Sequence, residues 1–443
     1  MRAAPGRSSM TAVIVAGSIV TAVTLGVRAT MGLFPDEIDA TLGVGIDTVG
    51  LTVALQNLIW GLGQPLAGAI ADRFGSARVL LGGALTYAAG LMVMAGASGP
   101  LGLYLGGGFV TGFGMSAASF AIVLAAMGKL VDEQRRSVAL GTATAFGSFG
   151  HFVLVPLAGA LIGTLGWRTT LTLLAIIAAS IVTVMRPLRT APARSAGPTA
   201  DLDVRDPSAS AGHGADEYHE PLRSVLSRAG RHRGYLRLNC AFFVCGFHVT
   251  FVGLHLPKSL TDAGLSSGIA TLSLALIGLT NIFGAFGAGL AGARIDKSRL
   301  LIIIYCTRAV LFAGLVLLPA TPVLALGFGL ALGVVWLASV PLTSGIVLGQ
   351  FGARNSGTLF GFVFLSHQLG AFGGAYGAGL AREITGSYDL WWWLAAALAV
   401  VAAVLHFGIS EHAAGESEEH GRAAPGAPAG SVASAGDAET TRR

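Results

Sequence analysis

Ionisable side chains inside long apolar stretches are the residues of this sequence best able to do chemistry. Arg28 lies within the first such stretch, which offers no acidic residue close by to neutralise it. A guanidinium in that setting attracts a carboxylate and can hold it through two parallel hydrogen bonds. Charges are expensive to bury in a membrane, and those that are found there commonly mark a solute pathway. We therefore predict that Arg28 binds an anion. The alternative is that it extends to the outer surface and pairs with Asp36, Glu37 or Asp39.

Two histidines recur at one spacing in the two halves of the chain. His151 and His367 are 216 residues apart, as are Gly141 and Gly357. Imidazole can donate to a carboxylate and titrates near neutral pH. Both histidines are therefore candidates for substrate binding and for proton coupling, and the spacing predicts that they face one another. The alternative is that each is a hydrogen-bonded polar residue between helices.

Four further polar residues and one arginine lie in apolar stretches. Asn57 and Asn281 are 224 residues apart, and we expect interhelical hydrogen bonds from both, with substrate contact by Asn281 as a second role. His248 and His255 share one helical face and are candidates for lining the outer half of a pathway. For Arg308 we expect a structural role, through bonds to backbone carbonyls or a neighbouring helix, or extension to the membrane surface.

The elements that carry these residues are membrane spans. Hydrophobic residues make up 53% of the chain, charged residues 12%, and the mean hydropathy is +0.70, which exceeds the range of ordinary soluble domains. Twelve apolar stretches come close to the ~20 residues that cross a bilayer. Of these, the fourth and tenth are long enough to tilt or overhang. The stretches are 11–34, 49–71, 79–98, 101–128, 138–163, 168–186, 235–257, 268–292, 300–319, 322–349, 357–381 and 388–410.

The order of spans and polar segments predicts four regions in an all-α membrane protein. Residues 1–186 and 235–410 form two pseudo-symmetric six-helix bundles, 187–234 form a cytoplasmic linker with a short interfacial helix near 222–226, and 411–443 form a disordered cytoplasmic tail. Lys and Arg are concentrated in alternate connections. The positive-inside rule then places both ends in the cytoplasm.

One short polar motif follows an apolar stretch twice. Gly68-Ala-Ile-Ala-Asp72-Arg73-Phe-Gly75-Ser-Ala-Arg78 closes the second stretch, and a shorter form, Gly292-Ala-Arg294-Ile-Asp296-Lys297-Ser-Arg299, closes the eighth. The glycines allow close helix contact and a tight turn, Asp72 can accept from backbone N–H groups, and Arg73 and Arg78 can pair with acids. The alternative is that the motif only anchors positive charge at the inner surface. The duplication itself is how many carriers are built.

This motif, its repeat and the twelve spans resemble the major facilitator superfamily over the whole chain. Other stretches are similar to its bacterial branch near oxalate/formate antiporters and monocarboxylate transporters: Gly26-Val-Arg28, Gly166-Trp167-Arg168, Tyr305-Cys-Thr-Arg308, Phe364-Leu-Ser-His367-Gln368-Leu-Gly370 and Gly386-Ser-Tyr388-Asp389. The resemblance implies alternating access in a bacterial inner membrane by a single chain. It also implies a gating role for the loop residues Gly68, Asp72, Arg73, Gly75, Arg78, Asp296 and Lys297. One departure is clear: characterised monocarboxylate carriers place an arginine four residues after an acidic residue in span eight, where this chain has Asn281 and Ala285.

Several classes of function are excluded by what the sequence lacks. It contains no phosphate-binding G-x-x-x-x-G-K-[ST] loop and no H-E-x-x-H, and its three cysteines have no histidine at metal-binding spacing. The net charge of +5 resides between apolar spans, which favours a lipid partner over nucleic acid. We therefore expect neither an enzyme nor a resident cofactor or metal.

The sequence favours secondary transport of a small organic anion, with a monocarboxylate as the expected substrate. Either proton coupling, through His151 or His367, or anion exchange would complete the cycle. Two alternatives stay open. One is proton-driven efflux of drug-like compounds, and the other is a membrane receptor that senses a solute without transporting it.

Overall fold

The computed structural model describes residues 7–189 and 222–410. Within these ranges the side chains of 7–9, 72, 128–129, 133–138, 222–223 and 352–357 are left out of the description. The predicted tail, 411–443, and most of the predicted linker, 190–221, also lie outside it. The described residues contain helices and turns but no strand.

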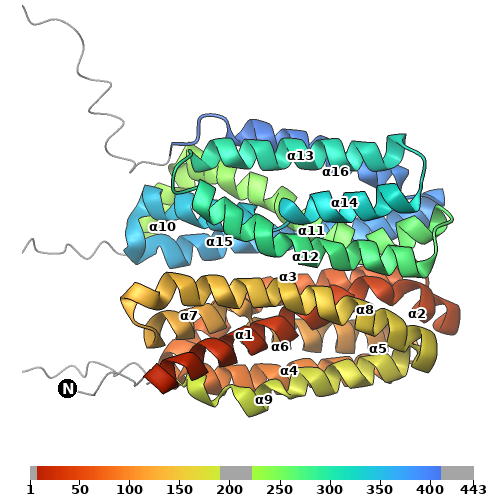
Figure 1. Ribbon diagram of the computed structural model, residues 1–443, viewed down its shortest axis with the longest axis horizontal. Helices are drawn as coiled ribbons and strands as arrows, with labels where there is room; N and C mark the ends of the chain where they lie inside the picture. The colour runs from red at the N-terminus through yellow and green to blue at the C-terminus, as the bar shows by residue number, and fades with distance from the viewer. Residues whose placement is uncertain (1–6, 190–221, 411–443) are drawn as a thin grey trace, which may run out of the picture.

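The helices form two bundles, one from each half of the chain, which lie one above the other in Figure 1. The first comprises α1 (Arg7–Ala29), η1 (Thr30–Leu33), α2 (Pro35–Leu42), α3 (Ile46–Phe74), α4 (Ser76–Ala95), α5 (Pro100–Leu103), η2 (Tyr104–Val110), α6 (Thr111–Ala117), α7 (Phe120–Leu130), α8 (Glu133–Ala179), α9 (Ile181–Val184) and η3 (Arg186–Leu188). The second comprises α10 (Leu222–Arg231), α11 (Arg233–Asp262), α12 (Ser267–Ala291), α13 (Lys297–Leu317), α14 (Pro322–Val334), α15 (Ser339–Thr385) and α16 (Asp389–His406).

Two of these helices are long enough to contain more than one span. In α8 the backbone leaves the helical region at Gly166, where φ is 76°, and this separates the predicted fifth and sixth spans. In α15, Ser339 bonds Cys245 while His367 packs on the next residue, Gly246. A straight helix would separate Ser339 from His367 by roughly 40 Å, so the chain must turn back between them.

The chain reverses direction at Gly166 in α8 and again within α15, and each reversal divides one long helix into two spans. The number of spans is then the expected twelve. Nine segments of the described chain are long and apolar enough to cross a membrane. One of them, Ala139–Val184, holds the two spans of α8, and α3 and the second part of α15 complete the set. The predicted fold of two six-helix halves is confirmed.

The fourth and tenth spans are not continuous helices. Each is interrupted within its length: the fourth at Ala118–Ser119, between α6 and α7, and the tenth at 335–338, between α14 and α15. Ser119 caps the new helix by accepting from Ile122 N (3.3 Å). A periodicity argument treats these spans as uniform helices and cannot detect such breaks.

Glycines let the paired helices of each half approach backbone to backbone. In the N-terminal half, a Cβ on Gly26 of α1 would lie 2.7 Å from the carbonyl oxygen of Gly150 in α8, and a Cβ on Gly150 would overlap the carbonyl of Ala22. In the C-terminal half, Gly246 and Gly370 make the equivalent contacts between α11 and α15. Close packing at small residues is the usual basis of helix association in lipid.

The two halves meet most closely at the end of the molecule that carries α2, which lies opposite the start of α1 (Figure 1). We call this the outer end, and the opposite one the inner end. At the outer end Gly32 packs on the carbonyl of Gly253, and a Cβ on Gly50 would lie 2.8 Å from the Ala375 oxygen. Toward the inner end, glycines of the helices that face the other half have no such neighbour within 4 Å: Gly68, Gly141, Gly287 and Gly361.

Charged side chains also link the halves at the outer end. Lys258 Nζ lies 2.8 Å from Asp36 Oδ1 of the N-terminal half and 2.9 Å from Asp262 Oδ1. Arg382 Nε donates to the second oxygen of Asp262 at 2.7 Å. Each of these pairs is partly exposed, so each contributes about 0–1 kcal/mol. The tight packing of the glycines is therefore the larger part of this closure.

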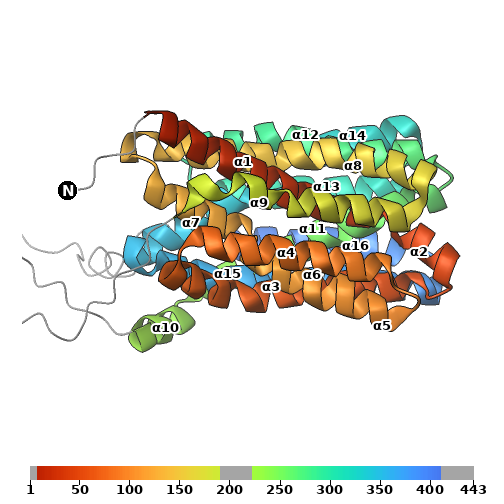
Figure 2. The same cartoon turned by 90° about the horizontal axis from the view of Figure 1, so that it is seen from below.

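The short helix α10 lies at the inner end, beside the bundle rather than within it (Figure 2). It covers the region where a short interfacial helix was expected. Its Val225 and Ala229 are buried, and its basic residues Arg228 and Arg231 lie in its last turn. After it, the His232 side chain accepts from Tyr235 N (3.1 Å) and caps the start of α11.

The close contact of α1 with α8 predicts a sharp difference between two glycines of α8. Gly150→Ala should lower the melting temperature of the purified protein, since the added methyl overlaps the Ala22 backbone and overpacking costs about 1–3 kcal/mol. Gly163→Ala is the matched control, because nothing lies within 4 Å of its Cβ position, and it should leave the melting temperature unchanged or raise it slightly. Equal effects of the two changes would contradict this packing.

Candidate functional site

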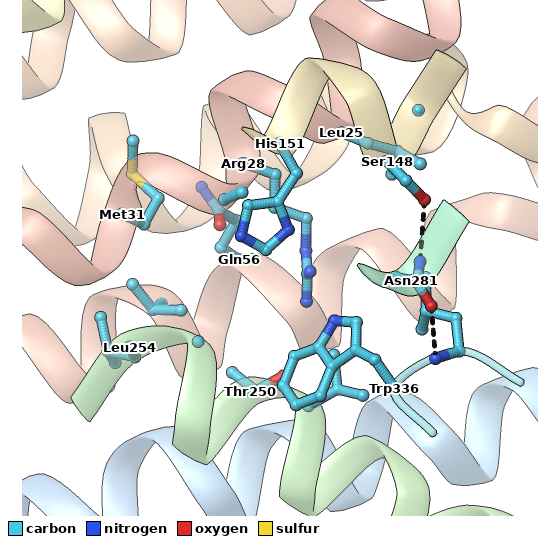
Figure 3. A pocket seen from close by; sticks show the side chains of 16 residues that line it. Leu25, Arg28, Met31, Gln56, Ser148, His151, Thr250, Leu254, Asn281 and Trp336 are labelled. Carbon is cyan, nitrogen blue, oxygen red and sulfur yellow. Dashed lines mark hydrogen bonds between the residues drawn. The ribbon is translucent and has the colours of Figure 1, made fainter. Parts of the chain in front are cut away.

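A cavity of about 80 Å³ lies between the two halves, near the middle of the spans (Figure 3). Helices α1, α3 and α8 line it from the N-terminal half, and α11, α12 and the 335–338 interruption line it from the C-terminal half. Its lining is Leu25, Arg28, Ala29, Met31, Val53, Gln56, Gly147, Ser148, His151, Val249, Thr250, Gly253, Leu254, Asn281, Trp336 and Leu337. Three of the four predicted substrate residues, Arg28, His151 and Asn281, therefore lie together.

Arg28 points into this cavity rather than to the outer surface. Its Nη2 donates to Asn57 Oδ1 (3.1 Å), and its guanidinium carbon lies 5.3 Å from the ring centre of Trp60. Its Nε is buried without a hydrogen-bond partner. Two of the three acids considered as surface partners are elsewhere engaged: Asp36 pairs with Lys258, and Asp39 accepts from Gly45 N. Among the described residues, no carboxylate neutralises this guanidinium.

His151 faces the same space from α8, on the other side of the Arg28 side chain from Trp336 in Figure 3. Its Nε2 is buried without a hydrogen-bond partner. In the neutral ring this nitrogen is an acceptor when Nδ1 carries the proton, and protonation of the ring turns it into a donor.

Two further cavity residues carry polar atoms without partners, and sequence analysis did not single out either of them. Gln56 donates from Nε2 to Gly107 O (3.1 Å), which fixes the amide and leaves its Oε1 unpaired. Thr250 Oγ1 is likewise buried and unpaired. The signal that could have found them was a polar residue within an apolar span. For Gln56 this signal was next to Asn57, which the sequence did single out. Buried polar atoms are normally paired, so four unpaired groups around one cavity mark a place for a polar ligand.

Asn281 joins the two halves at the edge of the cavity. Its Nδ2 donates to Ser148 Oγ of α8 (2.8 Å), and its Oδ1 accepts from Leu337 N (2.9 Å). The amide nitrogen and the amide oxygen of Asn281 are therefore both engaged in interhelical bonds, and the residue also lines the cavity. Asn57 makes one interhelical bond, in which its Oδ1 accepts from Arg28 of α1, and its Nδ2 donates within α3 to Val53 O (2.8 Å).

His367 does not line the cavity, contrary to the symmetry argument. It is buried in the C-terminal half, with ring centres 5.7 Å from Phe364 in a stacked pair and 5.1 Å from Phe242. Its Nδ1 bonds Gln368 Oε1 (3.1 Å). Sequence spacing placed it in the right span, but the rotation of a helix about its own axis decides which face a residue occupies.

The two histidines of α11 also lie away from the cavity. His248 bonds Ala395 O (2.9 Å), and His255 bonds both Tyr388 Oη (3.1 Å) and Ala375 O (2.8 Å). Both are fully buried within the C-terminal half. The expectation that they line the outer half of a pathway is wrong, because the shared face turns toward α16 and α15.

The repeated loop motif lies at the inner end, away from the cavity. Gly75 has φ 92°, a left-handed conformation that makes the turn from α3 into α4. Arg73 and Arg78 are exposed, and Arg78 reaches Phe74 O at 3.5 Å. Gly68 makes no close helix contact here, and the side chain of Asp72 is outside the described set.

In the repeat of the motif, the charged side chains contact their own loop and the inner part of the tenth span. Asp296 pairs with Arg299 (3.0 Å). The Lys297 stem packs beside Gly345 of α15, since a Cβ at that glycine would lie 2.9 Å from Lys297 Cε. These contacts lie within the C-terminal half.

Twelve spans in two halves around a central polar cavity define a membrane transporter of the two-bundle type. The chain belongs to the Major Facilitator Superfamily, whose family model matches residues 16–375. It is similar to Monocarboxylate transporter 13 of Rattus norvegicus, at 24% identity over 85% of this chain and 83% of that protein. It is also similar to Monocarboxylate transporter 3 of the same species, at 26% identity over 87% of this chain and 76% of that protein.

Solved structures give the same fold. The crystal structure of a D-xylose-proton symporter superposes with a TM-score of 0.71 over 90% of this chain and 97% of that one, at 13% identity. The family and the fold identify a transporter and not an enzyme, as expected.

The positions of the two histidines predict different responses to truncation. His367→Ala should destabilise the ligand-free protein by about 2 kcal/mol or more, because it empties a packed site between Phe242 and Phe364 and removes the hydrogen bond to Gln368. His151→Ala should cost less than half as much, since it enlarges an existing cavity. Melting temperatures of the two purified variants, each compared with the parent, would measure this. A larger loss for His151→Ala would contradict the placement.

Proposed function

We propose that this protein carries a small organic anion, a monocarboxylate, through the cavity between its halves. The observation that supports this most directly is Arg28: a guanidinium with no acidic partner among the described residues and with an unpaired Nε at the cavity. A carboxylate would supply both the missing negative charge and the missing acceptor. The monocarboxylate transporters to which the chain is similar support the same substrate class.

The size of the cavity favours a small solute. Sites for drug-sized ligands commonly measure about 300–1,000 Å³, whereas this cavity measures about 80 Å³. A carboxylate of a few carbon atoms suits that volume. Efflux of bulky compounds, the alternative considered from the sequence, has no comparable support.

The unpaired acceptor in the cavity favours an anion that also carries a hydrogen-bond donor. Gln56 lines the cavity, and its buried Oε1 is a fixed, unpaired acceptor because Gly107 holds the other end of the amide. A bare carboxylate offers this oxygen nothing, while a hydroxyl group on the same small molecule would donate to it. Thr250 can accept or donate and would serve either group.

The unpaired Nε2 of His151 supports proton coupling. In the tautomer that carries its proton on Nδ1, the neutral ring presents a lone pair at Nε2, which repels a carboxylate oxygen. Protonation of Nε2 converts that acceptor into a donor, so the anion and the proton bind together. We infer proton symport on this basis. Anion exchange without a proton is the alternative, and it would leave His151 neutral throughout.

Transport would proceed by alternating access, with a single chain as the working unit. The closely packed outer end and the looser inner end support an inward-facing arrangement in this conformation. The inner end also carries the exposed Arg73, Arg78, Arg294 and Arg299, which support a cytoplasmic location for that end and for both termini.

Arg28→Gln should abolish or strongly weaken carboxylate binding. The loss of a charged hydrogen bond is worth about 1.5–3 kcal/mol, or roughly 10- to 100-fold in Kd. Thermal stabilisation of the purified protein by a panel of short carboxylates would measure it, with each acid tested beside its hydroxyl-bearing analogue. Arg168→Gln is the matched control: that arginine also lies over a tryptophan and donates to a carbonyl, but at the outer end.

Stabilisation only by cationic or bulky neutral compounds would overturn the carboxylate proposal and favour efflux. Saturable uptake into proteoliposomes is the companion measurement. Ligand binding without any uptake would support the receptor alternative.

Replacement of His151 should separate anion binding from proton binding. The parent should take up close to one proton per carboxylate bound, measured by calorimetry at one pH in two buffers of different ionisation enthalpy. His151→Gln offers a permanent N–H donor and should bind the anion without proton uptake. His367→Gln should keep the uptake of the parent, since that residue lies outside the cavity. Unchanged uptake in His151→Gln would refute this route.

A further inference from the structure

The interruption of the tenth span places bare backbone groups beside the cavity. Helix α14 ends at Val334 and α15 starts at Ser339, and Trp336 and Leu337 of the segment between them line the cavity. The last carbonyls of a helix have no partner within that helix. In the interior of a membrane such groups must find donors from the protein.

Arg308 of α13 supplies those donors. Its side chain is fully buried, with 0% exposed. Nε and Nη2 both donate to Val335 O (3.2 and 2.7 Å), and Nη2 also donates to Trp336 O. The cation lies at the C-terminal end of α14, where the helix dipole favours positive charge. The remaining contacts are Nη1 with Cys245 Sγ (3.7 Å) and the ring of Tyr305, whose centre is 5.2 Å away.

The segment that Arg308 holds is connected to the ligand cavity by one further bond. Leu337 N donates to Asn281 Oδ1, and Asn281 donates in turn to Ser148 of the other half. Arg308 itself does not line the cavity. It therefore fixes, from behind, the backbone that orients Asn281 and the indole ring of Trp336.

The equivalent break in the N-terminal half shows that closing an interruption does not need an arginine. There, Ala118 O accepts from the hydroxyl of Thr24 (3.2 Å), and Ser119 accepts from Gln64 (3.0 Å). Neither Ala118 nor Ser119 lines the cavity. The stronger, forked donor is found at the break whose residues form the cavity wall.

We propose that Arg308 is a positioning residue for substrate binding: it locks the 335–338 segment so that Asn281 and Trp336 are held in place for the anion. The proposal rests on the proposed function in that the cavity is taken as the anion site. The guanidinium fork, and not charge alone, does the positioning, because two neighbouring carbonyls must be held at once.

The first test needs no ligand. Hydrogen exchange of the amides of Trp336 and Leu337 should be at least about tenfold faster in Arg308→Gln than in the parent, because local opening of the segment becomes easier. Arg308→Lys keeps the charge without the fork and should show faster exchange too; it serves alone if Arg308→Gln does not fold. Tyr305→Phe is the control on the same helix: it loses only the bond to Ala241 O and should leave exchange in this segment unchanged. Exchange equal to that of the parent in the Arg308 variants would overturn the proposal.

The second test asks whether Arg308 acts through Asn281. The ligand is the short carboxylate that stabilises the parent most. Arg308→Lys should raise its Kd about tenfold in the parent and less than about threefold in Asn281→Ala, because the bond from Leu337 N to Asn281 is already lost in that variant. An equal rise in both backgrounds would assign Arg308 a general structural role instead. If no carboxylate binds the parent, the proposed function fails, while the exchange test still decides the role of Arg308.

Discussion

The architecture depends on keeping a positive charge inside the membrane without an acidic partner. Arg28 meets this constraint with one amide acceptor, Asn57, and one aromatic face, Trp60, and part of its hydrogen-bonding capacity is left over. An acidic neighbour would satisfy the charge permanently and close the site to other anions. No acid stands beside the Arg28 guanidinium among the described residues. The cavity between the halves is found at this position, and unpaired polar groups surround it.

The two buried arginines illustrate opposite solutions to the same electrostatic problem. Two backbone carbonyls accept three hydrogen bonds from Arg308, and its Nη1 contacts Cys245 Sγ, so this side chain holds structure. Arg28 has one acceptor and an open side, so it can receive a ligand. What separates a structural arginine from a binding arginine here is the number of unengaged N–H groups, which depends on tertiary contacts and not on residue type.

Much of the fold could be predicted from the sequence because the bilayer sets the length of each span, and Arg28 and His151 stood out as ionisable residues within such spans. The interruption at 335–338 could not be found, because its residues are as apolar as those of the helix around it. His367 was misplaced because repeat spacing fixes depth but not helix rotation. Gln56 and Thr250 were missed since neutral polar residues are common in spans, and only an unpaired atom beside a cavity distinguishes them.

The closure at the outer end consists largely of backbone packed on backbone, at Gly32 with Gly253 and at Gly50 with Ala375. Such a barrier contains few side chains whose rotamer changes would open a transient passage. It can part only when whole helices separate, and small ions are excluded until they do. Under the proposed proton symport, a carrier closed in this way would lose little of the proton gradient between turnovers, so its glycines would preserve that gradient as well as the packing of the helices.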